Sequence, residues 1–403
     1  VFFVVFFVVS FREAIERALA LPQVVEEDLA HAGEHSLEVH LPFLQMLLDD
    51  FVLAPFVVGE ASAAEVAEVI HYEPTESLDP EFLGLLASIG IEKGKPFAPD
   101  ARMKEILTDA AAVGNATART ITFRSRNPGQ YIYEDSAWFL GFFGGTHEFE
   151  IDGVALNDAK TLFFYYATGN TPAMAIKMEG VGSQYAAATV DDDGARLDGG
   201  KTYRLNLPAN IPYKDFWSIV VYDNQSRSML QTDQRFPGIN SEGSARPNAD
   251  GSIDIFFGPK APKGKESNWI QTVPGKGWNV IFRLYGPLGP WFEKTWRLGE
   301  IDLMADVPAV APTGTTPKMA TDIPASITTP ERVETRIGTL EFVDGFPTDK
   351  TVELVYDNLD FMRGMEAFLT GISGSSMSFF REGSQGLGAI EAHQVVLFDK
   401  LMH

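Results

Sequence analysis

The sequence lacks cysteine and has few basic residues for its length. With no cysteine among 403 residues, disulfide bonds, thiolate nucleophiles and cysteine-ligated zinc are excluded. The 32 lysines and arginines are outnumbered by 55 aspartates and glutamates, which gives a net charge of -23. Because binding to a phosphate backbone needs clustered basic side chains, we expect this acidic protein to have no nucleic-acid partner.

Apolar runs long enough to cross a membrane are also missing. The N-terminal run 1–9, VFFVVFFVV, has nine apolar residues, whereas a transmembrane helix needs about 20. No basic stretch precedes this run and no small-residue cleavage site follows it, so we expect neither a membrane span nor a signal peptide in this chain. We interpret the run as a buried strand. A Gly-x-Ser-x-Gly motif, typical of serine hydrolases, is absent as well.

The order of apolar and polar residues predicts a mixed, α+β fold. Residues 1–71 are expected to form a small α/β fragment, with helices at 11–21 and 62–70 and a strand at 51–58. Residues 72–121 follow as a helical connector with helices at 79–89 and 100–120. Pro80 occupies a position that is favoured at the start of a helix.

Residues 122–305 are expected to form a large antiparallel β-sandwich of the jelly-roll type. Strict alternation and uniformly apolar runs both indicate strands, and glycine-rich turns separate them. The alternating stretches are 147–151, 203–207 and 252–256, and the apolar runs, interpreted as central strands, are 162–166 and 218–222. Residues 306–330 read as a linker. Residues 331–403 are expected to be a helical segment, with a helix at 348–371 and further helices after it.

One stretch resembles the Memo family. Residues 13 to about 70 carry ALPQVVEEDLAHAGEHSLEVHLPFLQ followed by FVLAPFVVGEASAAEVAEVI. That family is similar to non-haem iron dioxygenases, so the resemblance implies a metal pocket. The family's other pocket residues are a histidine upstream and an Asp-x-x-His and a cysteine downstream, and none of them has a counterpart here.

Two further stretches resemble bacterial proteins that combine the domain-of-unknown-function families 1254 and 1214. For family 1214, the resemblance covers 74 to about 304 and rests on WSIVVYDNQSRSMLQTD, NADGSIDIFFGP, NWIQTVPGKGW and RLYGP. It implies a jelly-roll-like sandwich preceded by helices. Residues 319–403 resemble the start of the same proteins, so the two parts follow one another in reversed order, which implies a permuted or composite chain. Such proteins are often exported, which leaves a periplasmic or a cytoplasmic location open.

A histidine-rich stretch is the candidate metal site. His31, Glu34 and His35 match the H-x-x-E-H pattern of some zinc proteases, and His40 follows nearby. In a helix, two histidines four residues apart share one face and can ligate one ion. Gly33 disfavours that helix, and no motif supplies a third ligand. No cofactor is otherwise evident, and zinc or iron at 31–40, or a purely structural role, both stay open.

Polar and aromatic residues in the predicted sandwich form the candidate ligand site. Small-molecule pockets combine apolar walls with a few convergent polar groups, and two stretches supply both. The candidate residues are Tyr131, Tyr133, Asp135, Trp138, Tyr222, Asp223 and Arg227. Asp223 and Arg227 could instead pin a loop, with the aromatic residues in the core.

Two function classes remain open from these observations. The first is a small-molecule-binding or non-catalytic sandwich protein, because no complete catalytic constellation is found. The second is an enzyme acting on a small apolar molecule, which requires the candidate residues to converge in one pocket. A remnant Memo-like metal site is a further alternative. Apolar helical faces near the C-terminus also make a homo-oligomer an open expectation.

Overall fold

The structure is a computed structural model that describes residues 3–9, 52–58, 70–71 and 79–386, apart from 168–169, 171, 244, 313 and 315. The chain divides into two compact units, Val1–Val352 and Glu353–His403, which are described separately. The helices predicted at 11–21 and 62–70 lie outside the described residues, apart from residue 70.

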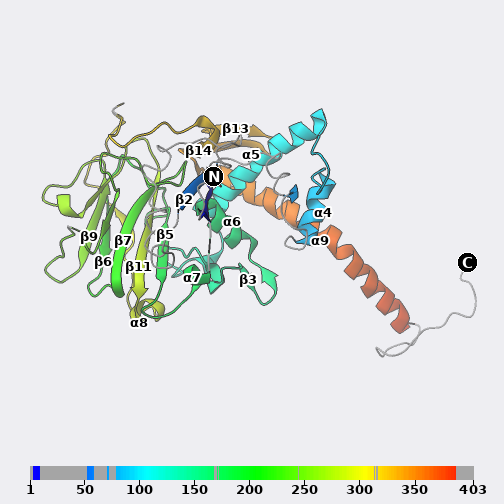
Figure 1. The fold of residues 1–403 in the computed structure, drawn as a ribbon, viewed down its shortest axis with the longest axis horizontal. Helices are drawn as coiled ribbons and strands as arrows, with labels where there is room; N and C mark the ends of the chain where they lie inside the picture. Colours follow the sequence, from blue (N-terminus) through cyan, green and yellow to red (C-terminus); the bar gives the residue numbers. More distant parts are fainter. Residues whose placement is uncertain are drawn as a thin grey trace, which may run out of the picture. The chain divides into compact units, whose positions relative to one another are not determined.

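The first unit is built around two four-stranded sheets (Figure 1). One sheet has the order β5 (Ser183–Ala188), β11 (Trp278–Pro287), β7 (Tyr213–Asp223) and β8 (Gly238–Asn240), with antiparallel neighbours. The other has the order β10 (Trp269–Gln271), β9 (Ile253–Gly258), β6 (Tyr203–Leu207) and β12 (Ile301–Leu303). Only the pairing of β9 with β10 is parallel among these.

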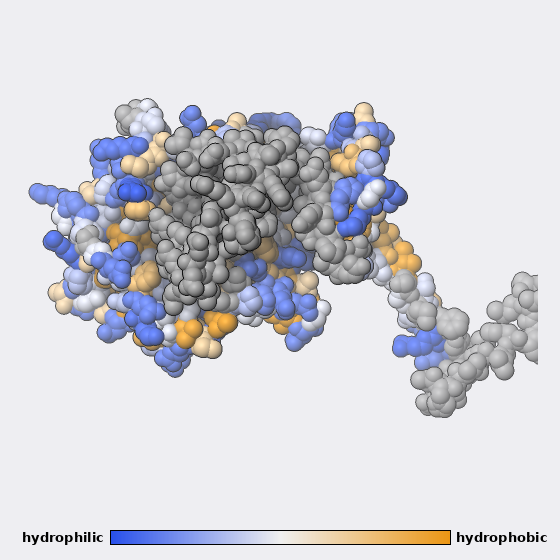
Figure 2. Space-filling view, viewed as in Figure 1, coloured by the Kyte–Doolittle hydropathy of each residue, from blue (hydrophilic) through white to orange (hydrophobic). Residues whose placement is uncertain are grey.

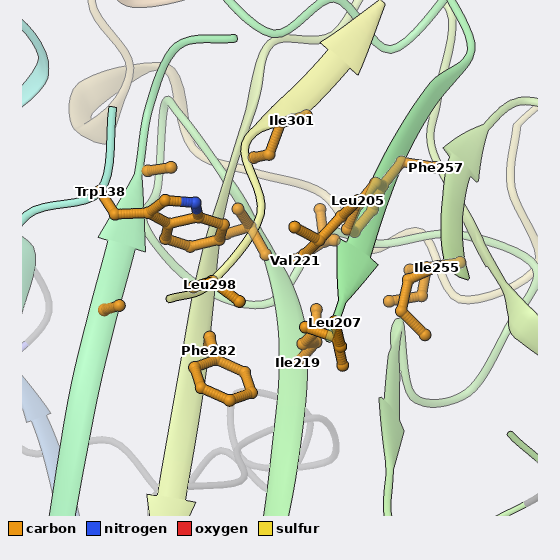
Figure 3. Packing of buried hydrophobic residues seen from close by; sticks show 14 of the residues in the cluster. Trp138, Leu205, Leu207, Ile219, Val221, Ile255, Phe257, Phe282, Leu298 and Ile301 are labelled. Carbon is orange, nitrogen blue, oxygen red and sulfur yellow. The ribbon is translucent and has the colours of Figure 1, made fainter. Parts of the chain in front are cut away.

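Side chains that alternate along the strands fill the space between the two sheets. Leu205 of β6 and Phe257 of β9 meet Ile219 of β7 and Phe282 of β11 in one buried cluster, which Trp138 completes (Figure 3). Successive residues of a strand point to opposite faces, so every second residue of each strand enters this core. The mixed α+β fold with a β-sandwich is therefore confirmed, as are the strands predicted at 203–207, 218–222 and 252–256.

Two helices precede the sandwich, as the sequence predicts. Asp79 caps α4 (Pro80–Ser88), and its carboxylate accepts a hydrogen bond from the backbone N–H of Phe82 at 2.8 Å. Asp100 caps α5 (Ala101–Phe123) in the same way, accepting from Met103 at 2.7 Å. These bonds satisfy backbone donors that have no partner inside the helix. The second half of α5 is buried and packs against α6 (Asn157–Tyr166).

The prediction of a strand at 162–166 is wrong, because these residues form the end of α6. A short apolar run fits a buried helix as well as a central strand, and here Ala159, Leu162 and Phe163 share one buried helical face. The strand predicted at 147–151 shrinks to β3 (Glu150–Ile151), which pairs with β4 (Val154–Ala155). Phe149, which directly precedes β3, has a positive φ of 55°, and this is not an extended conformation.

The helical segment predicted for 331–403 also needs correction. Its first part is a three-stranded antiparallel sheet with the order β13 (Arg332–Thr335), β14 (Gly338–Val343) and β15 (Phe346–Pro347). Asp344 and Gly345 join the last two strands, with φ values of 48° and 79°. An Asp-Gly pair with two positive φ angles is the preferred two-residue hairpin connection, so the local sequence itself explains this turn.

The rest of that segment is one long helix, α9 (Asp349–Gly386), most of which belongs to the second unit. The prediction of a helix at 348–371 is confirmed, although the helix continues past the expected break. Gly371 and Gly374 each cost about 1 kcal/mol relative to alanine within a helix, yet α9 runs through both.

The N-terminal apolar run forms β1 (Phe3–Val9), which pairs antiparallel with β2 (Val52–Val58). Strands are therefore confirmed at both places. Short elements complete the described chain: α7 (Pro172–Ala175), α8 (Gly289–Phe292) and 3-10 turns at Pro128–Gln130, Phe143–Gly145, Glu266–Asn268 and Ala325–Ile327. Within the described residues, no helix combines the length and the apolar character that a bilayer crossing requires.

Candidate functional site

A buried polar cluster lies at the end of β7, and we call it the Asp223 junction; it consists of Arg119, Asp223, Arg227, Lys276 and Asp344. Asp223 is 3% exposed. Its Oδ1 accepts hydrogen bonds from the backbone N–H groups of Gln225 and Ser226, both at 2.8 Å. Its Oδ2 lies 3.0 Å from Nζ of Lys276, which also lies 3.4 Å from Oδ1 of Asp344.

Arg119 reaches this junction from α5 and is 1% exposed. Its guanidinium donates to the carbonyl oxygens of Asn224 at 2.9 Å, Gly345 at 3.0 Å and Gln225 at 3.2 Å. One side chain therefore ties the helix to the β7 loop and to the β14–β15 hairpin. Burial lowers the pKa of Arg119, and the nearby Asp223 and Asp344 carboxylates act against that effect.

Arg227 occupies a strained position in the same loop, with a φ of 60°. Its guanidinium lies 4.3 Å from the centre of the Tyr165 ring of α6 and donates to the Gln225 carbonyl oxygen at 2.6 Å. The Arg227 backbone N–H donates to the Asp223 carbonyl at 2.8 Å. Asp223 and Arg227 are thus joined through the backbone, while the Asp223 carboxylate pairs with Lys276.

The acidic and basic partners of the junction perturb one another. Burial raises the pKa of Asp344, and the nearby Lys276 ammonium works against this rise. For Lys276, burial alone would lower the pKa, but the carboxylates of Asp223 and Asp344 outweigh it, and the pKa is raised. Lys276 is therefore a stable cation between two carboxylates, and the junction is a network that connects α5, β7, the turn before β11 and the β14–β15 hairpin.

A second cluster lies on the face of the β5–β11–β7 sheet that points away from the core. We call it the Arg283 face; its members are Tyr185, Phe216, Tyr222, Arg283 and Tyr285. The strand register places Arg283 between Tyr185 of β5 and Ser218 of β7. Arg283 Nη2 donates to the Tyr222 hydroxyl at 2.5 Å, and its guanidinium carbon lies 5.6 and 5.9 Å from the Tyr222 and Tyr185 ring centres. Phe216 and Tyr285 stack with ring centres 4.0 Å apart.

Arg283 carries an uncompensated charge within the described part of the chain, because no described carboxylate forms an ion pair with it. Burial acts to lower its pKa, but the surrounding tyrosine hydroxyls outweigh this effect and the pKa is raised. Burial also raises the pKa of Tyr285 to about 12, so this phenol is neutral at pH 7. The face therefore presents one fixed positive charge among aromatic rings, with no described carboxylate paired to it, which is an arrangement suited to an anion.

Tyr166 of α6 lies near one end of the Arg283 face. Its hydroxyl donates to Oδ1 of Asn279, which shares a face of β11 with Arg283. Burial raises the pKa of Tyr166, and the neighbouring Tyr222 adds to the rise. Asn279 in turn donates to Oδ1 of Asn224 at 2.9 Å. Hydrogen bonds therefore connect the neighbourhood of the Arg283 face with the loop that holds the Asp223 junction.

A small pocket borders the same face. It has a volume of about 20 Å³, which is room for about one water molecule. The residues around it come from β5, α7 and the segment before α6: Leu140, Gly141, Phe142, Met174, Ala175, Lys177, Gln184 and Tyr185. Because Tyr185 belongs to both, the pocket and the Arg283 face share a wall. The exposed Lys177, one of these lining residues, adds a second cation to the surroundings of the pocket.

The other predicted ligand-binding residues lie in different surroundings. Tyr131 donates from its hydroxyl to the Ser125 carbonyl at 2.9 Å, and burial raises its pKa. Asp135 is exposed and lies 3.0 Å from Arg297, which lowers the pKa of the aspartate. The guanidinium of Arg297 also lies 4.7 Å from the Tyr133 ring centre. Trp138 is a core residue whose indole N–H donates to the Gly299 carbonyl at 2.7 Å.

The structure thus brings Tyr222, Asp223 and Arg227 to the β7 end of the sandwich, where Tyr222 and Asp223 point to opposite faces of the strand. It places Tyr133 and Asp135 with Arg297, away from the contacts of Asp223 described above. Ligand binding by the seven residues stays a prediction. Sequence reasoning missed Arg283, although the spacing of Arg283 and Tyr285 on an alternating strand was a usable signal.

The candidate metal ligands His31, Glu34, His35 and His40 lie outside the described residues. Within the described residues, no group of three or more histidine, aspartate or glutamate side chains is placed to hold a metal ion. Zinc or iron binding at 31–40 therefore stays a prediction.

Comparison with solved structures gives weak likenesses. The VPA0106 protein from Vibrio parahaemolyticus is 18% identical, with a TM-score of 0.35 over 67% of this chain and 66% of that chain. An uncharacterised protein from Burkholderia cenocepacia is 15% identical, with a TM-score of 0.26 over 53% of this chain and 46% of that one. Both scores are too low to support an argument about function.

Sequence comparison finds two partial relationships. A MEMO1 family protein from Archaeoglobus fulgidus is 46% identical over 64 residues, which are 15% of this chain and 23% of that protein. One from Ignicoccus hospitalis is 45% identical over 80 residues, 19% of this chain and 28% of that protein. The chain therefore spans about a quarter of the length of these relatives.

The model of the family "Protein of unknown function (DUF1214)" matches residues 182–289. The resemblances to the Memo family and to family 1214 are confirmed, and the resemblance to family 1254 stays a prediction. The stretch that matches the DUF1214 model includes Asp223 and Arg283.

Proposed function

We propose that the sandwich binds a small molecule with an apolar body and an anionic group, and that Arg283 recognises the anion. The single observation that carries the proposal is the position of Arg283. Its charge is partly withdrawn from water on the outer face of β11, and no described carboxylate pairs with it. A buried charge without a counter-ion costs several kcal/mol, and a bound anion would remove that cost.

The aromatic neighbours support an apolar body for the ligand. The Tyr185 and Tyr222 rings flank the guanidinium, and the stacked pair of Phe216 and Tyr285 extends the aromatic surface. Rings bury large apolar areas, while the tyrosine hydroxyls offer additional hydrogen bonds. A carboxylate suits the guanidinium because two parallel N–H groups can bind its two oxygens.

The pocket beside Tyr185 is too small for such a ligand unless side chains around it move. At about 20 Å³ it accommodates about one water molecule. A ligand of the size of benzoate therefore requires side chains that line the pocket to move. Met174 is half-buried and Lys177 is exposed, and both side chains are long and flexible. We expect these two residues to change rotamer when a ligand binds.

Binding of simple model ligands to the full chain tests the proposal. Isothermal titration with benzoate should give saturable binding, and the uncharged benzyl alcohol should bind at least about tenfold more weakly. Arg283→Met should abolish benzoate binding, and Arg283→Lys should weaken it while keeping the charge. The matched control is Arg204→Met on the other sheet, where Arg204 pairs with Asp302 at 3.0 Å, and it should bind benzoate normally.

Equal binding of benzoate and benzyl alcohol would contradict the proposal, as would benzoate binding that survives Arg283→Met. Mass spectrometry of the recovered ligand addresses the alternative of an enzyme. Recovery of unchanged benzoate is expected of a binding protein, and a new product would favour the enzyme.

A further inference from the structure

The second unit of the chain carries an apolar stripe along α9. Seven large side chains of this helix are between 49% and 74% exposed: Phe361, Met362, Met365, Phe368, Leu369, Ile372 and Phe379. Figure 2 shows apolar residues at the surface where α9 is in view. With 100° of rotation per residue, the seven fall within one face of the helix about 120° wide. A continuous stripe of this kind, unlike scattered apolar residues, indicates an interaction surface.

The spacing within the stripe is that of a coiled coil. Phe361, Met365, Phe368 and Ile372 alternate in steps of four and three, and Phe379 continues the pattern one heptad after Ile372. Residues spaced in this way pack as knobs into the holes of a second helix. We propose that this stripe pairs with the same stripe of a second copy of the chain, forming a parallel two-helix coiled coil.

The flanking positions favour the parallel arrangement. Met362 and Leu369 lie on one side of the seam, and Gly364 and Gly371 lie on the other. In a parallel pair, each side of the seam faces the opposite side of the partner helix, so large residues meet glycines. Nothing lies within 4 Å of the position where either glycine would carry a Cβ, so the partner's side chains have room there.

The exposed area of the stripe and the small number of charged residues within it both favour a second copy of the chain as the partner. At about 200 Å² for a full-sized apolar side chain, the seven residues expose on the order of 800 Å² per copy. Two copies would then bury about 1,600 Å², which is the size of a standard stable interface. The chain carries a net charge of -23, yet Phe361–Phe379 contains one arginine and one glutamate, Arg363 and Glu366. Two acidic copies can therefore approach here without direct repulsion. A membrane-surface helix, by contrast, needs a polar face rich in lysine and arginine.

Sedimentation of the full chain tests the proposal. The chain should sediment at twice its mass of 44.3 kDa at micromolar concentration. Phe368→Glu places a charge in the seam and should shift the protein to a monomer. Ala367→Glu introduces the same charge next to it but on the other side of the helix, and it should stay a dimer. Circular dichroism of both variants shows whether the helix is retained.

The absence of cysteine allows a second test that does not depend on destabilising the helix. In a parallel, in-register pair, position 365 of one copy faces position 365 of the other. Mild oxidation of Met365→Cys should therefore give a covalent dimer, while Ala367→Cys should remain uncrosslinked. A monomeric unmodified chain would overturn the proposal, and so would a dimer that survives Phe368→Glu. A monomer that co-sediments with phosphatidylglycerol vesicles would assign the stripe to a membrane surface instead.

Discussion

Nη2 of Arg283 lies 2.5 Å from the hydroxyl oxygen of Tyr222, and the two side chains come from neighbouring strands on the outer face of one sheet. This contact fixes the guanidinium between two tyrosine rings. Because the partner of the Arg283 guanidinium is a hydroxyl and not a carboxylate, the positive charge of Arg283 remains available to a ligand. Arg119 differs from Arg283, because its guanidinium donates hydrogen bonds to three backbone carbonyl oxygens.

We predict that Arg119→Met strongly destabilises the first unit. The substitution leaves the carbonyl oxygens of Asn224, Gln225 and Gly345 without the donor that now serves them. Buried unsatisfied acceptors cost about 1–3 kcal/mol each, so the free energy of unfolding should fall by about 3 kcal/mol or more. Urea titration measures this loss. The matched control, Arg102→Met on the exposed start of α5, should change it by less than about 0.5 kcal/mol.

A second prediction concerns the hairpin residue Gly345. Its φ of 79° suits glycine, and a Cβ there would lie 2.5 Å from Nη1 of Arg119. Gly345→Ala should therefore lower the free energy of unfolding by about 2 kcal/mol, through backbone strain and displacement of Arg119. Gly314→Ala is a fair control, because its φ is also positive but nothing lies within 4 Å of its Cβ position. Similar losses in both variants would show that the contact with Arg119 contributes nothing.

A third prediction is a pH dependence that arises from Asp344. Burial raises the pKa of this carboxyl in the folded chain, so the folded state holds a proton more tightly than the unfolded state. The stabilising contribution is fully present below the unfolded pKa of about 3.9 and is lost as the pH rises through the folded value. Asp344→Asn removes this titration. The stability of the unmodified chain relative to the variant should therefore be higher at pH 4 than at pH 7, and a difference of the opposite sign would contradict the prediction.

A fourth prediction concerns the Memo-like stretch. If 31–40 binds a metal, titration with zinc or ferrous iron should show one saturable site per chain, and the double substitution of His31 and His35 by alanine should remove it. His147→Ala should leave it intact, because that histidine lies far along the chain, just before β3. An unchanged affinity in the double variant would assign the bound metal elsewhere.

Local patterns predicted the strands whose side chains alternate. Tyr203, Leu205 and Leu207 are buried on one side of β6, as the alternation requires. The run at 162–166 gave no such pattern, and its helical form depends on a face that packs near α5. The sheet that contains β13–β15 was missed although an Asp-Gly turn marks it. The continuous course of α9 through Gly371 and Gly374 runs against the local preference of glycine.

The candidate site was harder to predict, because its contacts join residues distant in sequence. Tyr222 was identified from its place after a buried strand, but its partner Arg283 is set by the register between β7 and β11. Pairing of Asp223 with Arg227 was an alternative to ligand binding, and the Asp223 carboxylate instead pairs with Lys276, in a turn that the sequence marks only as glycine-rich. A single sequence does not encode such registers in any local pattern.

The most direct test of the account follows the Arg283 side chain itself during ligand titration. Nitrogen-15 NMR of the arginine Nε–H groups, assigned with Arg283→Lys, reports each guanidinium separately. On addition of benzoate, the Arg283 signal should shift and saturate, while that of Arg204, already paired with Asp302, should stay in place. An Arg283 signal that does not move, or one that moves in step with Arg204 without saturating, would contradict an anion site on this face.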